Sequence, residues 1–425
     1  MTYETAEDYL SDLEKRAVLP KGFRTATTNL TFLPVERPVD KPLPMRLNLL
    51  LLEEATAAFG GVFTRNAFPG APVLLGRELI DEPLSRGVLV NNKIANVGGP
   101  RALDDAKALQ AEAGKLLGIA PRQLFVASTG IIGWSLPLKD MKKALPQLVP
   151  GLQNTSALPF AKGIMTTDAW PKVRSRQLFG GRLTAVAKGA GMIEPNMATM
   201  LVYILTDIEL SRKALRDMLP RVVGKTFNCI SIDSDQSTSD MALMWSSQRV
   251  PCSDQVAFER ALEDLCRDLA QDIVRNGEGT SHVLEARISG AYDLAQARIA
   301  GKAIVNSLLV KTAIFGNDPN VGRLLASVGD AFGNLGLPLT PKAITLKIAD
   351  ETVFEKGAFQ LDPMKEARLS KAFAAAGLPE KKSGFPPHEL NVVLALDLGQ
   401  GSTETVVWGS DLSYEYVREN ADYRS

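Results

Sequence analysis

The segment from Lys188 to Met200 carries the residue types in this chain that could do chemistry. It contains glycines, a single lysine and, near its end, Thr199, which stands directly before an apolar, strand-like run over residues 200–205. A chain cut before Thr199 would give that residue a hydroxyl nucleophile and a free α-amine. An α-amine titrates at about pH 8, far below a lysine, so it could take the proton from the hydroxyl. The same local pattern is also typical of a glycine-bearing loop that enters a core strand.

The scarcity of histidine favours such a self-supplied base. The chain has two histidines, His282 and His388, and His388 lies in a proline-rich loop. No H-E-x-x-H sequence occurs, and no His and Cys residues have the spacing of zinc ligands, so we expect no metal. The sequence Gly224-Lys-Thr lacks the first glycine of a phosphate-binding loop, and no G-x-S-x-G serine elbow is present. If the chain is an enzyme, we expect its base not to be a histidine.

Composition limits the class of ligand. Lys+Arg and Asp+Glu both number 48, so the formal net charge is zero and the whole-chain charge favours neither nucleic acid nor an anionic membrane surface. Small neutral or zwitterionic ligands fit better. The three cysteines form no C-x-x-C pair, and the N-terminus has no basic region followed by an apolar core. We therefore expect a soluble, cytoplasmic protein without disulfides.

The elements that must position these residues follow from the spacing of apolar side chains. Helical spacing predicts helices over residues 6–15, 103–117 and 256–276 and after Asp318. Apolar runs predict strands over residues 61–65, 71–76, 87–92, 123–127, 183–187 and 200–205. Runs over residues 390–396 and 404–408, on either side of Gly399-Gln-Gly401, predict a hairpin. Because strands and helices do not alternate strictly, an α+β or layered α/β arrangement is favoured over a doubly wound parallel sheet.

Several segments occur in this chain in the order in which one known enzyme family has them. The most specific is A-K-G-A-G-M-I-E-P-N-M-A-T-M-L, from Ala187 to Leu201. The others are Ser128–Gly133, Ile164–Asp168, Gly277–Gly279, Gly316–Arg323 and residues 411–417 and 420–425. Together they closely resemble the ornithine acetyltransferase family, also called glutamate N-acetyltransferase, of arginine biosynthesis. The resemblance covers most of the chain.

The resemblance implies an α/β fold, namely a layered α/β/β/α-type sandwich like that of N-terminal-nucleophile enzymes, with a smaller C-terminal α+β part. It also implies self-cleavage between Ala198 and Thr199, so that residues 1–198 form an α chain and residues 199–425 a β chain that begins at the nucleophile. Thr129 and Gly130 match the family's oxyanion hole. The family's substrate-binding positions match Thr166, Lys188, Thr199, Glu278, Asn420 and Ser425.

The implied reaction transfers an acetyl group from N2-acetylornithine to glutamate through an acyl-threonine, in a ping-pong cycle. Glu278 follows the C-terminus of a predicted helix, where a negative charge gains nothing from the helix dipole, so we expect it to pair with the terminal ammonium of ornithine. No metal or organic cofactor is required, although some family members also accept acetyl-CoA. The implied partners are the two amino acids and the α and β chains, as an α2β2 assembly.

Some segments depart from the family's usual sequence. The family commonly has Asn-Ser-Gly-Asn-Ala-Asn where this chain has Asn91-Asn-Lys-Ile-Ala-Asn96, and Asp-Gly-Asp-Thr-Ser-Thr-Asn-Asp at Asp233–Asp240. Trp is common where Val321 stands, and Ala-Thr-Lys where this chain has Thr280-Ser-His282. Three alternatives therefore stay open: an N-terminal-nucleophile amidase or aminopeptidase, a divergent paralogue acting on another N-acyl amino acid, and a non-catalytic relative.

Overall fold

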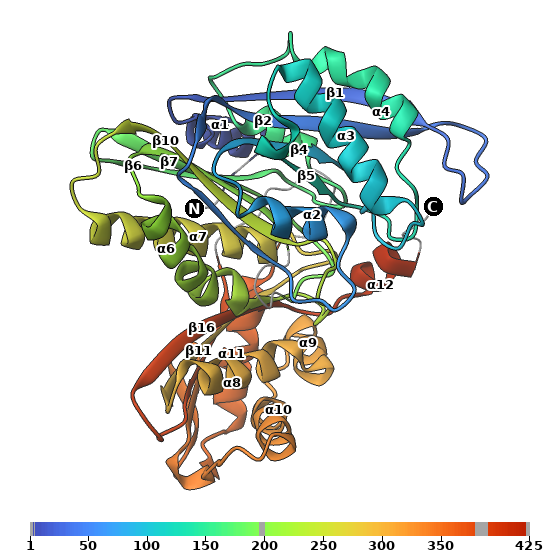
Figure 1. Cartoon of the computed structure of the whole chain (residues 1–425). Coiled ribbons are helices and arrows are strands. Elements are labelled where there is room, and N and C mark those ends of the chain that lie inside the picture. The colour runs from blue at the N-terminus through green and yellow to red at the C-terminus, as the bar shows by residue number, and fades with distance from the viewer. Residues whose placement is uncertain (1–2, 4, 195–199, 379–389, 422–425) are drawn as a thin grey trace.

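The computed structural model describes residues 3, 5–194, 200–378 and 390–421 of the 425-residue chain. Two stacked β-sheets form its main body (Figure 1). The first sheet has the order β1 (Phe23–Phe32), β2 (Leu43–Thr56), β4 (Ser85–Asn91) and β5 (Leu124–Ser128). The second has the order β3 (Phe59–Phe63), β10 (Met241–Val250), β8 (Leu201–Ile208), β7 (Gly181–Lys188) and β6 (Lys172–Leu178).

The central strand β8 shows why the two sheets stack. Leu201, Tyr203 and Leu205 pack in the core that the two sheets share, whereas Val202 and Ile204 pack in the core on the helical side. A strand buried on both faces needs a continuous apolar run, and β8 has one.

Helices cover both outer faces of the two sheets, so the α/β/β/α sandwich expected from the sequence is confirmed (Figure 1). The second sheet is covered by α6 (Arg212–Lys225) and α7 (Gln255–Arg275). The helices that accompany the first sheet are α2 (Ala71–Leu79), α3 (Ala102–Leu117), α4 (Leu138–Ala144) and α5 (Leu158–Gly163), and α1 (Ala6–Arg16) packs on β6.

A third sheet forms the smaller C-terminal part, also as expected (Figure 1). Its order is β14 (Ala358–Phe359), β13 (Glu351–Glu355), β12 (Thr345–Ile348), β15 (Val392–Asp397), β11 (Val283–Ala291), β16 (Thr403–Ser410) and β9 (Ile230–Ser231). The helices of this part are α8 (Leu294–Asn306), α9 (Leu308–Phe315), α10 (Val321–Asn334) and α11 (Pro363–Ala376). A last helix, α12 (Tyr414–Ala421), leaves this part and lies beside the main body (Figure 1). No helix within the described ranges is long and apolar enough to cross a membrane.

Most of the elements predicted from the sequence form close to their predicted bounds. The helix α3 ends at Gly118, whose backbone is left-handed with φ +65°, a conformation that favours glycine. The N-cap Asp254 of α7 accepts hydrogen bonds from the backbone N–H groups of Val256 and Ala257. The strands β7 and β8 are antiparallel neighbours, with Leu183 opposite Thr206.

The prediction of a strand over residues 71–76 is wrong, because this run lies in α2. Pro72 stands in the first helical turn, where its missing N–H costs no hydrogen bond. Val73 and Leu75 are buried. A short apolar run cannot separate a buried helix from a strand by periodicity, and here the proline decides for the helix.

The predicted hairpin over residues 390–408 is also wrong. β15 and β16 do not pair with each other, because β11 lies between them, parallel to β15 and antiparallel to β16. The connection instead crosses the end of β11, where the backbone N–H groups of Gln400 and Gly401 both donate to the carbonyl oxygen of Gly290 at 2.8 Å. A Cβ at Gly401 would lie 2.3 Å from the carbonyl oxygen of Ala291, so glycine allows this close crossing.

A buried carboxylate, Asp168, ties three segments together at one end of the sandwich. It accepts hydrogen bonds from the Lys172 ammonium at 2.5 Å, the Gly189 N–H at 2.8 Å and the Thr166 N–H at 3.1 Å. The side chains of Asp168 and Lys172 are both fully buried. Burial alone would raise the pKa of the Asp168 carboxyl, but the positive charges of Lys172 and Lys188 and these hydrogen bonds hold it below its ordinary value.

A buried cation, Lys311 on α9, holds together the ends of β9 and β16, two neighbouring strands of the third sheet. Its ammonium donates to the carbonyl oxygens of Ile232, at 2.8 Å, and Ser410. Burial lowers its pKa from 10.5 to about 8, against the opposing charges of Asp411, Asp233 and Glu194. The charged form of this lysine is therefore less favourable in the folded protein than in the unfolded chain.

Replacing Asp168 with Asn should destabilise the protein by about 3–5 kcal/mol, because it leaves the buried Lys172 ammonium without its carboxylate. The measurement is the free energy of unfolding in urea, made in the Thr199→Ala background, in which the chain should stay uncut and unfolding stays unimolecular. A matched control is Asp217→Asn, which breaks the Lys213–Asp217 pair, also a lysine and an aspartate four positions apart but exposed; its cost should stay below about 1 kcal/mol. Equal costs in the two variants would contradict the structural role of Asp168.

Lys311 should make the protein more stable as the pH rises from 8 to 10.5. Below pH 8 the lysine is protonated in both states; above it the folded state loses the proton first, so the unfolded state binds more protons and the free energy of unfolding rises with pH. The full gain is roughly 3 kcal/mol. Urea unfolding over this range should show a rise in the free energy of unfolding that is smaller by about this amount in Lys311→Met than in the protein that keeps Lys311. Parallel curves for the two proteins would rule out a contribution of Lys311 to the pH dependence of stability.

Candidate active site

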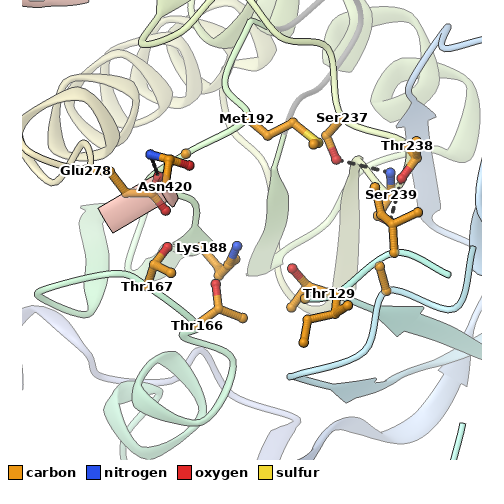
Figure 2. A pocket seen from close by; sticks show the side chains of 15 residues that line it. Thr129, Thr166, Thr167, Lys188, Met192, Ser237, Thr238, Ser239, Glu278 and Asn420 are labelled. Atoms are coloured by element: carbon orange, nitrogen blue, oxygen red, sulfur yellow. Dashed lines mark hydrogen bonds between the residues drawn. The ribbon is translucent and has the colours of Figure 1, made fainter. Parts of the chain in front are cut away.

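One cavity of about 290 Å³ gathers most of the residues that the sequence singled out (Figure 2). Its lining includes Thr129, Gly130, Thr166, Lys188, Glu278 and Asn420. These residues come from segments nearly 300 positions apart, yet they meet at one end of the sandwich. Ala198, Thr199 and Ser425 lie outside the described residues, so what the sequence predicts for them stays a prediction.

Thr129 and Gly130 form the turn that ends β5. The Thr129 N–H donates to the carbonyl oxygen of Asn91 at 3.1 Å, and the Ile131 N–H donates to the carbonyl oxygen of Lys93 at 2.9 Å. Gly130 has φ +126°, and a Cβ there would lie 2.2 Å from the carbonyl carbon of Lys93. Only glycine can therefore hold this turn against the neighbouring backbone, at the point where a hydroxyl and an N–H meet the cavity.

The cation of the cavity is Lys188, the last residue of β7. The ladder to β8 places it opposite Leu201, the first residue of that strand. Thr166 lies near it in Figure 2, and the Thr166 backbone is held by Asp168. The same carboxylate therefore fixes the segments on which both cavity residues stand.

The anion of the cavity is Glu278, which follows α7 in a glycine-flanked turn and is 7% exposed. Its N–H donates to the carbonyl oxygen of Ala190 at 2.8 Å, and its carboxylate accepts from the Asn420 amide at 2.9 Å. A Cβ at Gly191 would lie 2.2 Å from this carboxylate, so the glycine leaves room for it. Two segments far apart in the sequence thus hold one carboxylate in place.

The charges are separated across the cavity. Figure 2 shows the Glu278–Asn420 pair on one side, Thr129 and residues 237–239 on the other, and Lys188 with Thr166 between them. A cavity that contains both a cation and an anion suits a zwitterionic ligand with a carboxylate and a second, positively charged group.

Several hydroxyl groups that line the cavity were not identified from the sequence. They belong to Thr167, Ser237, Thr238 and Ser239. The sequence feature that could have pointed to them is the Ser- and Thr-rich run before β10. Asp240, which closes that run, is buried, and its Oδ2 atom has no hydrogen-bond partner among the described residues. Burial raises the pKa of the Asp240 carboxyl well above its ordinary value, against smaller opposing effects of Ser237 and Lys188.

Neither the histidine in the described ranges nor the cysteines line this cavity. His282 is buried, and its Nδ1 atom lies 2.8 Å from a carboxylate oxygen of Asp411. Cys229, Cys252 and Cys266 are free thiols, and Cys266 is a core residue of α7, as its helical spacing predicts. Among the described residues no three His, Cys, Asp or Glu side chains come together as a metal site would require.

Comparison with known proteins agrees with the family resemblance. A relative from Rhodococcoides fascians, named arginine biosynthesis bifunctional protein ArgJ, is 38% identical over 364 residues, which cover 85% of this chain and 86% of its own. The glutamate N-acetyltransferase of Methanocaldococcus jannaschii is 37% identical over 393 residues, 88% of this chain and 93% of its own. A solved structure of the ArgJ protein from Bacillus halodurans is 29% identical, with a TM-score of 0.45, and covers 52% of this chain and 97% of that one. The model of the ArgJ family matches residues 42–425, and the chain belongs to this family.

Proposed function

We propose that this chain transfers an acetyl group from N2-acetylornithine to glutamate, giving ornithine and N-acetylglutamate. The observation that carries the proposal is the single cavity in which Thr129, Lys188 and Glu278 meet. Membership of the ArgJ family, in which relatives are named glutamate N-acetyltransferase, supports an acyltransferase with this product.

The cavity suits the acetyl donor part by part. The Lys188 ammonium would pair with the α-carboxylate of N2-acetylornithine, and the Glu278 carboxylate with its terminal ammonium. The acetyl carbonyl oxygen would then face Thr129 and Gly130. A hydroxyl or N–H donor aimed at a developing oxyanion typically lowers the barrier by about 3 kcal/mol.

Thr199 would be the nucleophile in the first half of the reaction. Its α-amine takes the hydroxyl proton while the threonine oxygen forms a bond to the acetyl carbon. The bond between that carbon and the ornithine nitrogen then breaks. The protonated α-amine of Thr199 gives its proton to the departing ornithine nitrogen. An acetyl-threonine ester remains.

Glutamate resolves the ester in the second half. Its amine attacks the acetyl carbon, the α-amine of Thr199 accepts the proton that the attacking nitrogen loses, and the threonine oxygen leaves with that proton. The cycle uses no metal or organic cofactor. The family resemblance also suggests acetyl-CoA as an alternative donor, which would transfer its acetyl group to the same threonine.

The mechanism requires the bond between Ala198 and Thr199 to be cut first. The resulting chains of residues 1–198 and 199–425 would stay together, because β7 belongs to the first, β8 to the second, and their backbones form one ladder. We propose an α2β2 assembly in the cytoplasm, as expected for this family.

Purified protein should run as two bands on a denaturing gel. The whole chain is 45.9 kDa, so a cut before Thr199 gives fragments of about 21 and 24 kDa, and Thr199→Ala should leave one uncut chain because the nucleophile is lost. Thr312→Ala, which changes an exposed threonine of α9, should still give both bands. An uncut wild type with full activity would falsify the mechanism.

Ornithine release from N2-acetylornithine should depend on glutamate. With glutamate present, we expect ornithine and N-acetylglutamate to form in equal amounts, measured by mass spectrometry; without it, release should stop after about one equivalent, because the acetyl-threonine persists.

The same assay separates transfer from hydrolysis. Sustained ornithine release without glutamate, together with free acetate, would show that water resolves the ester and would make the protein an amidase. Replacing N2-acetylornithine by acetyl-CoA then tests the alternative donor.

A further inference from the structure

A second cavity, of about 440 Å³, adjoins the first. The two cavities share Gly130, Ile131, Thr166 and Thr167. The additional walls come from β1, β2, the loop after β4 and Met165, which follows α5. The second cavity therefore begins at the turn that faces the acyl carbonyl in the proposed cycle.

The second cavity is positively charged. Arg46 and Lys93 line it, and none of the described residues in its lining is an aspartate or glutamate. The Arg46 guanidinium donates to the carbonyl oxygens of Lys162 at 2.8 Å and Met165 at 3.2 Å, which leaves its charge without a bonded carboxylate among the described residues. Burial lowers the pKa of Arg46, which Asp168 opposes. An anion in this cavity would relieve that unfavourable burial.

Lys93 is held at an unusual backbone angle. Its φ is +77°, a left-handed conformation that costs a residue with a Cβ roughly 1–2 kcal/mol. Its carbonyl oxygen accepts the Ile131 N–H, so the Gly130 turn fixes its backbone. Within the described ranges its ammonium forms no hydrogen bond or ion pair. This chain therefore keeps a lysine beside the turn at a backbone angle that would suit glycine.

We propose that the second cavity is the subsite for the acyl group and that it takes an acyl chain ending in a carboxylate, such as a succinyl or glutaryl group. This inference rests on the proposed function. Lys188 and Glu278 would occupy both charged ends of the ornithine part, so the acyl chain is the part of the donor left to extend past Gly130. An acetyl group adds only a methyl there and would leave the cavity empty.

The chemistry is that of the acetyl transfer, with a longer acyl group. The amide bond to ornithine breaks, an ester bond to the threonine oxygen forms, and the acceptor amine later replaces that oxygen. The distant carboxylate takes no part in these bond changes. It pairs with the Lys93 ammonium and the Arg46 guanidinium, both of which lie outside the first cavity's lining.

The test compares N2-succinylornithine with N2-butanoylornithine, whose acyl groups have the same four-carbon chain with and without the terminal carboxylate. The rate of ornithine release gives kcat/KM for each. In the wild type we expect succinyl to exceed butanoyl at least tenfold, since a hydrogen bond to a charged group contributes about that factor. In Lys93→Gln and in Lys93→Gly, which suits the positive φ, the succinyl-to-butanoyl ratio should fall about tenfold.

Lys356→Gln is the matched control. It also replaces a lysine with a positive φ, +54°, but one that lies in the C-terminal part with an exposed side chain, so the ratio should stay at the wild-type value. A wild type that prefers butanoyl, or a ratio that no Lys93 variant changes, would overturn the proposal. A Lys93→Gln variant with an unchanged ratio but impaired use of acetyl-CoA would assign the cavity to the phosphates of that donor instead.

The failure of the proposed function would look different. In that case none of the donors would release ornithine, including N2-acetylornithine. Calorimetry would then give the affinities of the succinyl and butanoyl compounds for the wild type and for Lys93→Gln. A succinyl-to-butanoyl affinity ratio that falls in Lys93→Gln would support the subsite. Equal affinities for the two compounds would reject it.

Discussion

The buried carboxylate of Asp168 is the contact on which the geometry of the first cavity depends. Its two oxygens accept hydrogen bonds from the backbone of Thr166, from Lys172 at the start of β6 and from the backbone of Gly189. Without it, Lys172 would be a charged group buried in the core, and the backbone next to Lys188, at Gly189, would lose its anchor. The position of a cavity cation is thus set by an ion pair that does not itself line the cavity.

The two parts of the chain contribute unequal shares of the site. The sandwich provides Thr129, Thr166 and Lys188, all on rigid strand ends or on loops tied to them. The C-terminal segment provides Asn420, on a helix with no buried residue, and that helix reaches back to bind Glu278. A hydrogen bond from Ser413 to the carbonyl oxygen of Gly279, at 2.6 Å, secures the approach of this helix. One wall of the cavity therefore belongs to an element of low intrinsic stability.

Helices and strands with a clear apolar period could be predicted from the sequence, and so could their ends. The helix α7 has both a periodic apolar face and an aspartate cap, and β7 and β8 each contain a mainly apolar run. The segments over residues 71–76 and 390–408 could not be assigned correctly. In the first, a short apolar run fits a helix as well as a strand, and in the second a strand from a distant part of the chain separates the expected partners.

The site was predictable only in part, and chiefly through the family resemblance. Local patterns give no reason why Thr129, Lys188 and Glu278 should meet, because their positions depend on the stacking of two sheets. Aspartate and lysine are usually found on protein surfaces, and only the folded structure shows that Asp168 and Lys172 are buried together. The left-handed backbone of Lys93 has no local signal either, since it is imposed by the neighbouring turn at Gly130.

The ladder between β7 and β8 has a consequence for the lifetime of the protein. In the uncut chain these neighbouring strands are joined by a short connection, so their pairing costs little loop entropy each time the chain folds. After a cut before Thr199, the same pairing has to be made between two separate molecules. Refolding of a protein cut there would be bimolecular and would depend on concentration, so its lifetime would depend chiefly on how slowly it unfolds.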